Sequence, residues 1–323
     1  MLELGTAKAQ PGEIDTGMLA AGELRDGSDF GLPVAAINGA HDGKTLYIQA
    51  ASDGDELNGV GVVREVVRRI DPRELSGAIL VVGILNYHGF HVAEHKNPID
   101  GTKLNRVFPG SSEGSSSERL AKLVYDNGVM CADLGIDLHQ GSTSRMIDEV
   151  RVRCGTGHSL YQDCLELASS FGMEYILDKK GPEGQLARAA PNDGVPVIDP
   201  ELGGSVGWDT ASIKKGVRGV FNVLKTYDFL PGEPSLPPHQ IRATSFDTVH
   251  ANHGGLLDFE VDLYDEVDEG DTLFTVTDVF GDERESVETE KDGIVWRMRR
   301  LPMVATGEYV MSVADGLEEI TTE

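Results

Sequence analysis

The sequence predicts a large α/β domain followed by a smaller all-β module. An apolar run at 46–50, an amphipathic stretch at 60–70 and a second apolar run at 78–85 succeed one another as strand, helix and strand, the order of a βαβ unit. After residue 238 the chain changes to short alternating runs broken by Gly-Asp turns, which is typical of an all-β unit. A chain of 323 residues is long enough for both parts.

The elements of the α/β part follow from apolar spacing and from stop signals. Residues 60–70 place apolar side chains at helical spacing with charges opposite, and Asp71-Pro72 ends that helix. Ser115 and Glu118 have the spacing of a capping box and therefore begin another helix. In chain order we expect a short strand-like piece at 16–24, strands at 33–39, 46–50, 78–85, 132–139, 150–154 and 195–198, and helices at 60–70, 119–125, 160–171 and 209–224.

A proline-rich segment at 231–238 is the clearest linker in the chain. It predicts an α/β domain at 1–232, which carries the candidate site described below, and an all-β domain at 233–323. Within the second domain, residues 267–273 and 304–310 look like two copies of one turn. Such a repeat favours a barrel-sandwich module.

The charge balance is strongly acidic. The chain has 28 Lys and Arg against 54 Asp and Glu, a formal net charge of −26. Nucleic acid is excluded as a partner, because phosphate binding requires a basic surface. The acids are spread along the whole chain, which favours a solvated surface adapted to high salt over a site for a cationic ligand. We therefore expect a halophilic surface and a stability that rises with salt.

Several features predict a cytoplasmic protein with no membrane partner. No apolar run approaches the length of a membrane span. The first residues lack the charged and apolar regions of a secretory signal. Cys131, Cys154 and Cys164 have no metal-binding spacing and are expected to be reduced thiols. The sequence is compatible with either a monomer or a homo-oligomer.

Three strand-like runs end in side chains that could form one site. They are followed by Asp53 and Glu56, by Asp137 and His139, and by Glu201. Open α/β sheets hold their ligands at the carboxyl ends of the strands. We therefore expect these side chains to meet at one edge of the sheet.

The chemistry of these residue types favours a metal site. A catalytic zinc ion uses three protein ligands and leaves a position for water, and Asp53, Glu56 and His139 supply that number. One Zn²⁺ per chain is therefore expected. The metal acidifies the water, and Glu201 is the candidate base that takes the proton. Asp137, two residues before His139 on a strand, points the same way and is expected to hold the other ring nitrogen.

The polar stretch at 86–110 is much longer than an ordinary connection and is a candidate substrate surface. Its histidines, His88, His91 and His95, could form a second metal site or simply hydrogen-bond. Asn105 and Arg106 precede Phe-Pro-Gly, and a rigid turn that presents a guanidinium suits the capture of a substrate carboxylate.

At these residues the chain resembles the succinylglutamate desuccinylase/aspartoacylase family of zinc carboxypeptidase-like deacylases. The matching stretches lie in order along nearly the whole chain: Asp53-Gly-Asp-Glu56-x-Asn-Gly, Asp100-Gly-x-x-Leu-Asn-Arg-x-Phe-Pro-Gly110, Ile136-Asp-Leu-His139 and Pro200-Glu-Leu-Gly-Gly204. The resemblance implies a three-layer carboxypeptidase-like mixed sheet. It also implies zinc on Glu56 and His139, catalytic Glu201, and Asn105 with Arg106 on the substrate's carboxylate.

The chain departs from the family pattern at two positions. The family's first zinc ligand is a His, where this chain has Asp53. An acidic ligand makes the set more negative, which weakens the metal as a Lewis acid and favours a harder ion. Relatives place an Arg where this chain has His95, so His95 is expected to polarise the scissile carbonyl instead.

The resemblance implies a metal-dependent amidohydrolase that removes an acyl group from a small N-acyl amino acid, giving a carboxylic acid and an amine. Two alternatives stand beside it. One is a carboxypeptidase-like peptidase on the same scaffold. The other is a non-catalytic member of the family that has lost zinc binding through Asp53.

Overall fold

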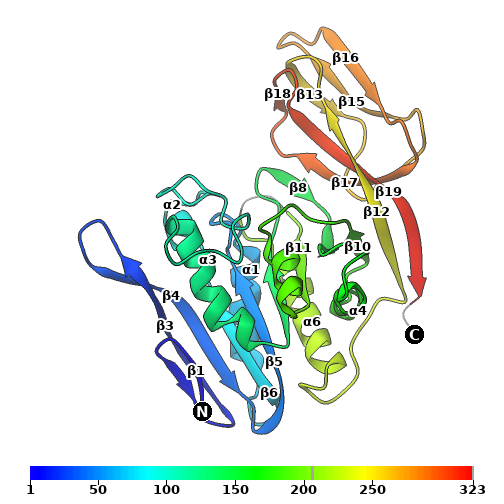
Figure 1. Cartoon of the computed structure of the whole chain (residues 1–323). Coiled ribbons are helices and arrows are strands. Elements are labelled where there is room, and N and C mark those ends of the chain that lie inside the picture. Colours follow the sequence, from blue (N-terminus) through cyan, green and yellow to red (C-terminus); the bar gives the residue numbers. More distant parts are fainter. Residues whose placement is uncertain (205–206, 322–323) are drawn as a thin grey trace.

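The computed structural model describes residues 1–204 and 207–321. A mixed sheet runs through the molecule with helices on both faces, and a smaller β-rich part stands at one end (Figure 1). The helices are α1 (Asn58–Arg69), α2 (Tyr87–Val92), α3 (Ser116–Asn127), α4 (Tyr161–Phe171), α5 (Leu186–Ala189) and α6 (Thr210–Thr226), with 3-10 turns η1 (Val129–Cys131) and η2 (Ala190–Asp193). The strands are β1 (Leu2–Leu4), β2 (Ala7–Ala9), β3 (Glu13–Glu23), β4 (Asp29–Asn38), β5 (His41–Ala50), β6 (Ser76–Val82), β7 (Leu134–Leu138), β8 (Ser144–Met146), β9 (Asp148–Val152), β10 (Tyr175–Asp178), β11 (Val197–Leu202), β12 (His239–His250), β13 (Gly255–Phe259), β14 (Glu266–Val267), β15 (Thr272–Thr277), β16 (Glu283–Glu288), β17 (Gly293–Arg299), β18 (Met303–Val304) and β19 (Tyr309–Thr321).

The large sheet has the order β14-β17-β19-β12-β10-β9-β11-β7-β5-β6-β4-β3. β5 pairs in parallel with both β6 and β7, and β11 pairs in parallel with β7. The pairs β3–β4 and β9–β11 are antiparallel. The sheet is therefore mixed, and the predicted βαβ unit is confirmed in β5, α1 and β6.

Alternation along the strands fills both faces of the sheet, because successive side chains point to opposite sides. Leu46 and Ile48 of β5 pack in one apolar cluster with residues of α1, α4 and α6. Tyr47, between them, lies in a second cluster with residues of α3 and α5. The carboxyl ends of β5, β7 and β11 are held side by side by these two cores.

The predicted capping box begins α3. Ser115 Oγ accepts from the backbone N–H of Glu118 at 3.4 Å, and Glu118 Oε2 accepts from the backbone N–H of Ser115 at 2.8 Å. The expected helix is therefore confirmed, and it is longer than predicted. By contrast α2 was not predicted: Asn86 Oδ1 accepts from the N–H of Gly89 and begins a short helix inside the expected loop.

The strands after the proline-rich segment join the large sheet. β12 pairs in parallel with β10, and β19 pairs with β12 along most of its length. A second sheet, of order β16-β15-β13-β18, packs on β17 and β19 through an apolar cluster that includes Phe274 and Met298. Among residues 1–204 and 207–321, no helix combines the length and the apolarity needed to cross a bilayer.

Candidate metal centre

Three acidic side chains of the site lie on the tight loop between β5 and α1. Asp53 is 0 % exposed, Asp55 7 % and Glu56 4 %. Ala51 has a φ of 52°, a left-handed conformation that non-glycine residues rarely adopt and that clusters at functional sites. Gly54 leaves no room for a side chain, since a Cβ there would lie 2.3 Å from the backbone carbon of Gly89 in α2.

His139 follows β7 and is held by the neighbouring strand β11. Its N–H donates to the carbonyl of Pro200 at 2.9 Å, and its carbonyl accepts from the N–H of Leu202 at 2.9 Å. This parallel bridge sets His139 beside Glu201. The carboxyl ends of the parallel strands β7 and β11 therefore place the imidazole of His139 and the carboxylate of Glu201 at one edge of the sheet, as the sequence predicts.

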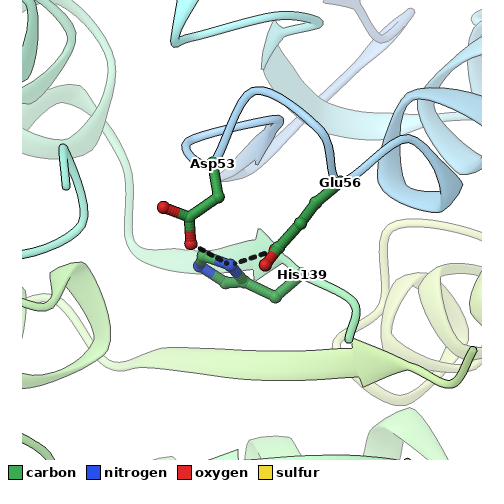
Figure 2. A group of neighbouring side chains, drawn as sticks. All are labelled: Asp53, Glu56 and His139. Carbon is green, nitrogen blue, oxygen red and sulfur yellow. Dashed lines mark hydrogen bonds and ion pairs between the residues drawn. The ribbon is translucent and has the colours of Figure 1, made fainter. Parts of the chain in front are cut away.

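Two of the three carboxylates of the β5–α1 loop, those of Asp53 and Glu56, converge on one nitrogen of His139 (Figure 2). His139 Nδ1 lies 2.8 Å from Glu56 Oε2 and 3.5 Å from Asp53 Oδ2. Ligand atoms of Asp53, Glu56 and His139 all lie within 4.8 Å of one another. The structure thus brings together the three residues that we expect to be metal ligands.

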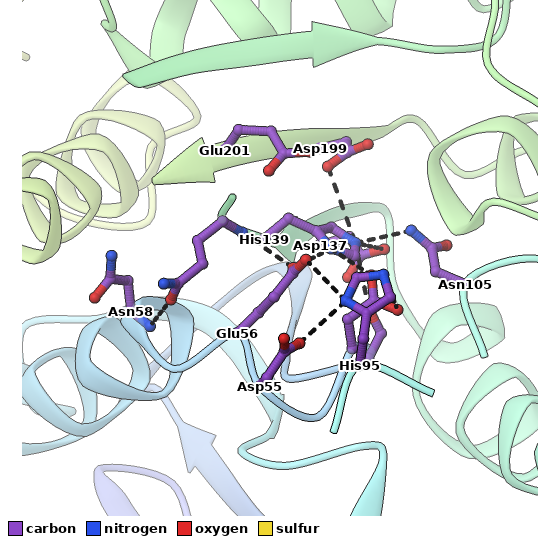
Figure 3. Close-up of polar contacts among 12 residues, drawn as sticks. Asp55, Glu56, Asn58, His95, Asn105, Asp137, His139, Asp199 and Glu201 are labelled. Carbon is purple, nitrogen blue, oxygen red and sulfur yellow. Dashed lines mark hydrogen bonds and ion pairs between the residues drawn. The ribbon is translucent and has the colours of Figure 1, made fainter. Parts of the chain in front are cut away.

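The other nitrogen of His139 faces a different set of polar groups (Figure 3). Its Nε2 lies 3.1 Å from Asp137 Oδ2, 2.8 Å from Asn105 Nδ2 and 3.2 Å from Ser52 Oγ. Asp137 is held in turn by Gln49, whose Nε2 donates to Asp137 Oδ1 at 2.8 Å. These contacts hold the ring at Nε2, so that Nδ1 points toward Glu56 and Asp53.

The titration of these groups reflects burial and crowding of charge. Burial and, after it, the nearby Asp53 carboxylate raise the pKa of Glu56 to about 7, while His139 acts to lower it. Burial alone would lower the pKa of His139, but the carboxylates of Asp137, Asp199 and Glu56 raise it well above its ordinary value. Such a concentration of buried negative charge is stabilised by a cation.

The donor set fits a divalent ion. Neither oxygen of the buried Asp53 accepts a hydrogen bond from any residue that the structure describes. Its nearest permanent charge is Lys103, whose Nζ lies 3.1 Å from Asp53 Oδ2. A fully buried carboxylate without hydrogen bonds is costly unless a charge compensates it. Two carboxylate oxygens and one imidazole nitrogen are suitable ligands for zinc and related ions.

Glu201 lines the same cavity and is engaged by a buried arginine. Arg151 of β9 places Nη1 2.5 Å from Glu201 Oε1 and Nη2 2.5 Å from Glu149 Oε1. Glu149 accepts a hydrogen bond from the indole N–H of Trp296, a residue of β17. The acid expected to act as base is thus fixed by a chain of polar contacts that begins in the C-terminal strands.

A cavity of about 500 Å³ joins these residues to the expected substrate groups. Asp53, Glu56, His139 and Glu201 all line it, together with the groups expected to meet substrate, His95, Asn105 and Arg106. Arg106 is exposed at the cavity. The Asn105 amide also makes two contacts within the protein, because Nδ2 faces His139 and Oδ1 accepts from the N–H of Leu186 at 3.0 Å.

Of the three loop histidines, only His95 approaches the acids. Its Nδ1 lies 3.0 Å from Asp55 Oδ1, and its Nε2 lies 3.6 Å from Asp53 Oδ1. His88 and His91 pack against aromatic rings instead: the centroid of His88 is 4.8 Å from Phe30, and that of His91 is 4.4 Å from Tyr87. The three therefore do not converge on one point.

Sequence reasoning missed several residues of the site. Asp55 stands between Asp53 and Glu56, and it could have been found from that motif alone. Arg151 and Lys103 carry no local signal, because a single basic residue is most often a surface charge. Arg297, on β17, also lines the cavity and comes from the part of the chain expected to form a separate domain.

Comparison with known families and proteins identifies relatives along the chain. Residues 42–227 match the model of the succinylglutamate desuccinylase/aspartoacylase catalytic domain. A curated relative is the N-alpha-acetyl-L-2,4-diaminobutyric acid deacetylase of Halomonas elongata. It is 26 % identical over 306 residues, which cover 90 % of this chain and 87 % of that protein.

Solved structures with similar folds cover almost the whole chain. A succinylglutamate desuccinylase from Silicibacter sp. TM1040 superimposes with a TM-score of 0.85 and 22 % identity, over 97 % of this chain and 100 % of that one. The product-bound ectoine utilization protein of Ruegeria pomeroyi gives a TM-score of 0.85 and 23 % identity, over 93 % and 94 % of the two chains. These likenesses establish that the mixed α/β fold is shared.

Proposed function

The chain belongs to the succinylglutamate desuccinylase/aspartoacylase family, and from that premise we propose that it is a metal-dependent deacylase of a small N-acyl amino acid. The proposed centre is one Zn²⁺ held by Asp53, Glu56 and His139. The observation that best supports this proposal is that three buried donors and Glu201 line one cavity of about 500 Å³, a volume suited to a small molecule. The name of the Halomonas relative, a deacetylase of an N-acetylated amino acid, supports an N-acyl amino acid as the substrate class.

The reaction is hydrolysis of an amide to a carboxylate and an amine. A divalent ion held by the three ligands supplies Lewis acidity, which polarises a carbonyl and makes water a stronger nucleophile at neutral pH. Glu201 takes a proton from the attacking water and passes it to the leaving nitrogen. Arg151 holds the Glu201 carboxylate in place through its 2.5 Å ion pair. Asp137 orients His139 through the ring nitrogen that faces away from Glu56.

The remaining residues bind the substrate. Arg106, exposed at the cavity, pairs with the carboxylate of the amino acid. His95, at the side of Asp53 and Asp55, stabilises the negative charge that develops on the carbonyl oxygen. Asn105 binds the same carboxylate beside Arg106, and its Nδ2 also lies 2.8 Å from His139 Nε2, which helps to fix the ring.

The finer features of the fold are also inferred. The mixed sheet with helices on both faces supports a three-layer, carboxypeptidase-like arrangement for residues 1–232. The two β-sheets after residue 232 support a barrel-sandwich module. The continuity of β12 with β10 means that the proposed second domain shares the large sheet with the first.

The decisive variant is Glu201→Gln. It keeps the size of the side chain but removes the base, so turnover of N-acetyl and N-succinyl amino acids should fall by about 10²- to 10⁴-fold or more while bound metal is retained. Glu183→Gln, the same change on an exposed side chain, is the control and should retain activity. Hydrolysis is followed by the release of free amine and metal by elemental analysis.

Two results would count against the assignment. Full activity in Glu201→Gln would remove the proposed base. Faster cleavage of short peptides than of every N-acyl amino acid tested would replace the deacylase with a peptidase.

A further inference from the structure

We propose that two copies of this chain associate through the tip of the β15–β16 hairpin, residues 278–282, which docks in a groove between α1 and α6 of the other copy. The contact lies outside the metal centre and does not rest on the proposed function. It joins two surface features of the chain, an exposed apolar tip flanked by acids and a groove lined by cations and apolar side chains.

The hairpin tip presents two apolar side chains to solvent. Phe280 is 90 % exposed and Val279 is 74 % exposed, the highest values among the large apolar residues of 1–204 and 207–321. Burial of such side chains by a partner is favourable, because it removes apolar area from water. Aromatic residues are also frequent anchors of protein interfaces.

The turn that carries these side chains is held by its own hydrogen bonds. The N–H of Gly281 donates to the carbonyl of Asp278 at 3.1 Å, and the N–H of Asp278 donates to the carbonyl of Asp282 at 2.9 Å. Asp278 Oδ1 accepts from the N–H of Phe280 at 2.8 Å and from that of Asp282 at 3.1 Å. Because the turn is ordered before it binds, docking costs little conformational entropy.

The surroundings of the tip are acidic. Residues 278–288 hold five acids and one arginine, and residues 239–323 hold 21 Asp and Glu against six Lys and Arg. Asp282 and Glu283, next to Phe280 in the sequence, are both exposed. A partner surface that is complementary to this tip is positively charged and offers apolar side chains to Phe280.

A groove of this kind lies between α1 and α6. Its volume is about 510 Å³, which is within the range of binding sites. Apolar side chains line it, among them Trp208, which is 48 % exposed. Glu65 is the only acid among the described residues that line the groove. Five cations line it: Arg64, Arg69, Lys214, Arg218 and Lys225.

Four of the five cations have no acidic partner. In the part of the chain that the structure describes, only Arg64 lies within ion-pair distance of an acid, Glu65, at 3.5 Å. Lys214 and Arg218 are exposed and one helical turn apart, so their like charges repel each other. The chain has 54 acids for 28 cations. Unpaired cations gathered around one groove of so acidic a chain favour an acidic partner from outside it.

The tip reaches the groove of a second copy and not its own. Figure 1 places β15 and β16 at the far end of the C-terminal strands, away from α6 beside the large sheet. Each copy has one tip and one groove, so a reciprocal exchange makes two equal contacts and closes a twofold dimer. The net charge of −26 repels the two copies at a distance, but salt at about 0.15 M screens charges that are more than roughly 8 Å apart.

The test measures the mass of the full-length chain by gel filtration with light scattering, in KCl at about 0.15 M. We expect a dimer of twice 34.8 kDa. Phe280→Asp and Arg218→Glu should each raise the dissociation constant of that dimer by about 10-fold or more. Arg68→Glu reverses an exposed cation of α1 that does not line the groove, and this control should remain a dimer.

Charge reversal distinguishes a lost contact from a damaged fold. Asp282→Lys with Glu283→Lys makes the tip basic, and Lys214→Glu with Arg218→Glu makes the groove acidic. Each double variant should be a monomer. A chain with all four substitutions again has opposite charges on tip and groove, and it should recover the dimer. Circular dichroism melts show that each variant is folded.

Three results would overturn the proposal. The first is a parent that stays monomeric up to about 100 μM, where a dimer with a micromolar dissociation constant is largely formed. The second is a dimer that persists in the folded Phe280 and Arg218 variants, which would place the interface elsewhere. The third is a monomer in the folded chain with all four substitutions, which would show that tip and groove do not meet. None of these results bears on the proposed deacylase activity.

Discussion

Asp137 acts on the proposed metal centre without belonging to it. It lies behind His139, 3.1 Å from Nε2, and it is itself fixed by Gln49. Burial raises the pKa of Asp137, against the opposing effect of His139. Its position fits a group that sets the orientation of the imidazole.

Asp137→Asn should therefore weaken metal binding without removing a ligand. Loss of such a partner costs about 10- to 100-fold in metal affinity. Competition with a chromophoric chelator measures the affinity. Asp133→Asn, on an exposed aspartate near the start of the same strand, is the control. Equal affinity in the Asp137 variant and the parent would show that the ring does not depend on this carboxylate.

At the scale of single residues, the direction of a side chain could be predicted where it follows from the residue's position along its own strand. Asp137 and His139 are two apart at the end of β7, so their common direction follows from alternation. Arg151 could not be assigned in this way. Its contact with Glu201 arises from the antiparallel pairing of β9 and β11, two strands distant in the sequence that no local pattern joins.

The short helix α2 packs against the loop that carries Asp53, Asp55 and Glu56. Its backbone packs directly on Gly54, within 2.3 Å of where a Cβ would lie, and the chain beyond it carries His95. Any side chain at position 54 must push this element away from the acids. The close packing of α2 on the acidic loop thus requires glycine at position 54.

Gly54→Ala should destabilise the fold and impair the site together. Forcing a methyl group into closely packed backbone costs roughly 1–3 kcal/mol. Displacement of His95 should also lower turnover. The matched control is Gly157→Ala, where a Cβ would have no neighbour within 4 Å. Chemical denaturation gives the free energy of unfolding, and an unchanged value for Gly54→Ala would contradict this packing.

Helices and strands can be predicted from the sequence where the signals that start and end them are local. The capping box of Ser115 and Glu118 begins α3 as expected. The strand β3 was expected only as a short piece near 16–24, because it is a half-exposed edge strand interrupted by glycines, yet it pairs with β4 over Glu13–Glu23. Its length is set by its partner strand and not by its own residues.

At the scale of the whole molecule, the C-terminal strands are joined to the α/β part through the large sheet, which the sequence does not predict. The sheet passes from β10 into β12, and Trp296 of β17 reaches Glu149 beside Arg151. The C-terminal strands therefore contribute to the site. The linker at 231–238 predicts where the pattern changes, but it says nothing of how the two parts pack, which depends on contacts between distant segments.

The net charge of −26 predicts a salt-dependent stability. Mutual repulsion of surface acids destabilises the compact state, and salt screens that repulsion. The melting temperature should therefore rise between low and molar KCl. A melting temperature that stays flat over that range would contradict a salt-adapted surface.

The most direct test of the proposed centre is the position of the metal itself. A crystal of the zinc-loaded protein, measured at the zinc absorption edge, should give an anomalous peak about 2.0–2.2 Å from Asp53, Glu56 and His139 ligand atoms. A zinc peak bound elsewhere, with none beside these three side chains, would contradict the metal centre on which the proposed chemistry depends.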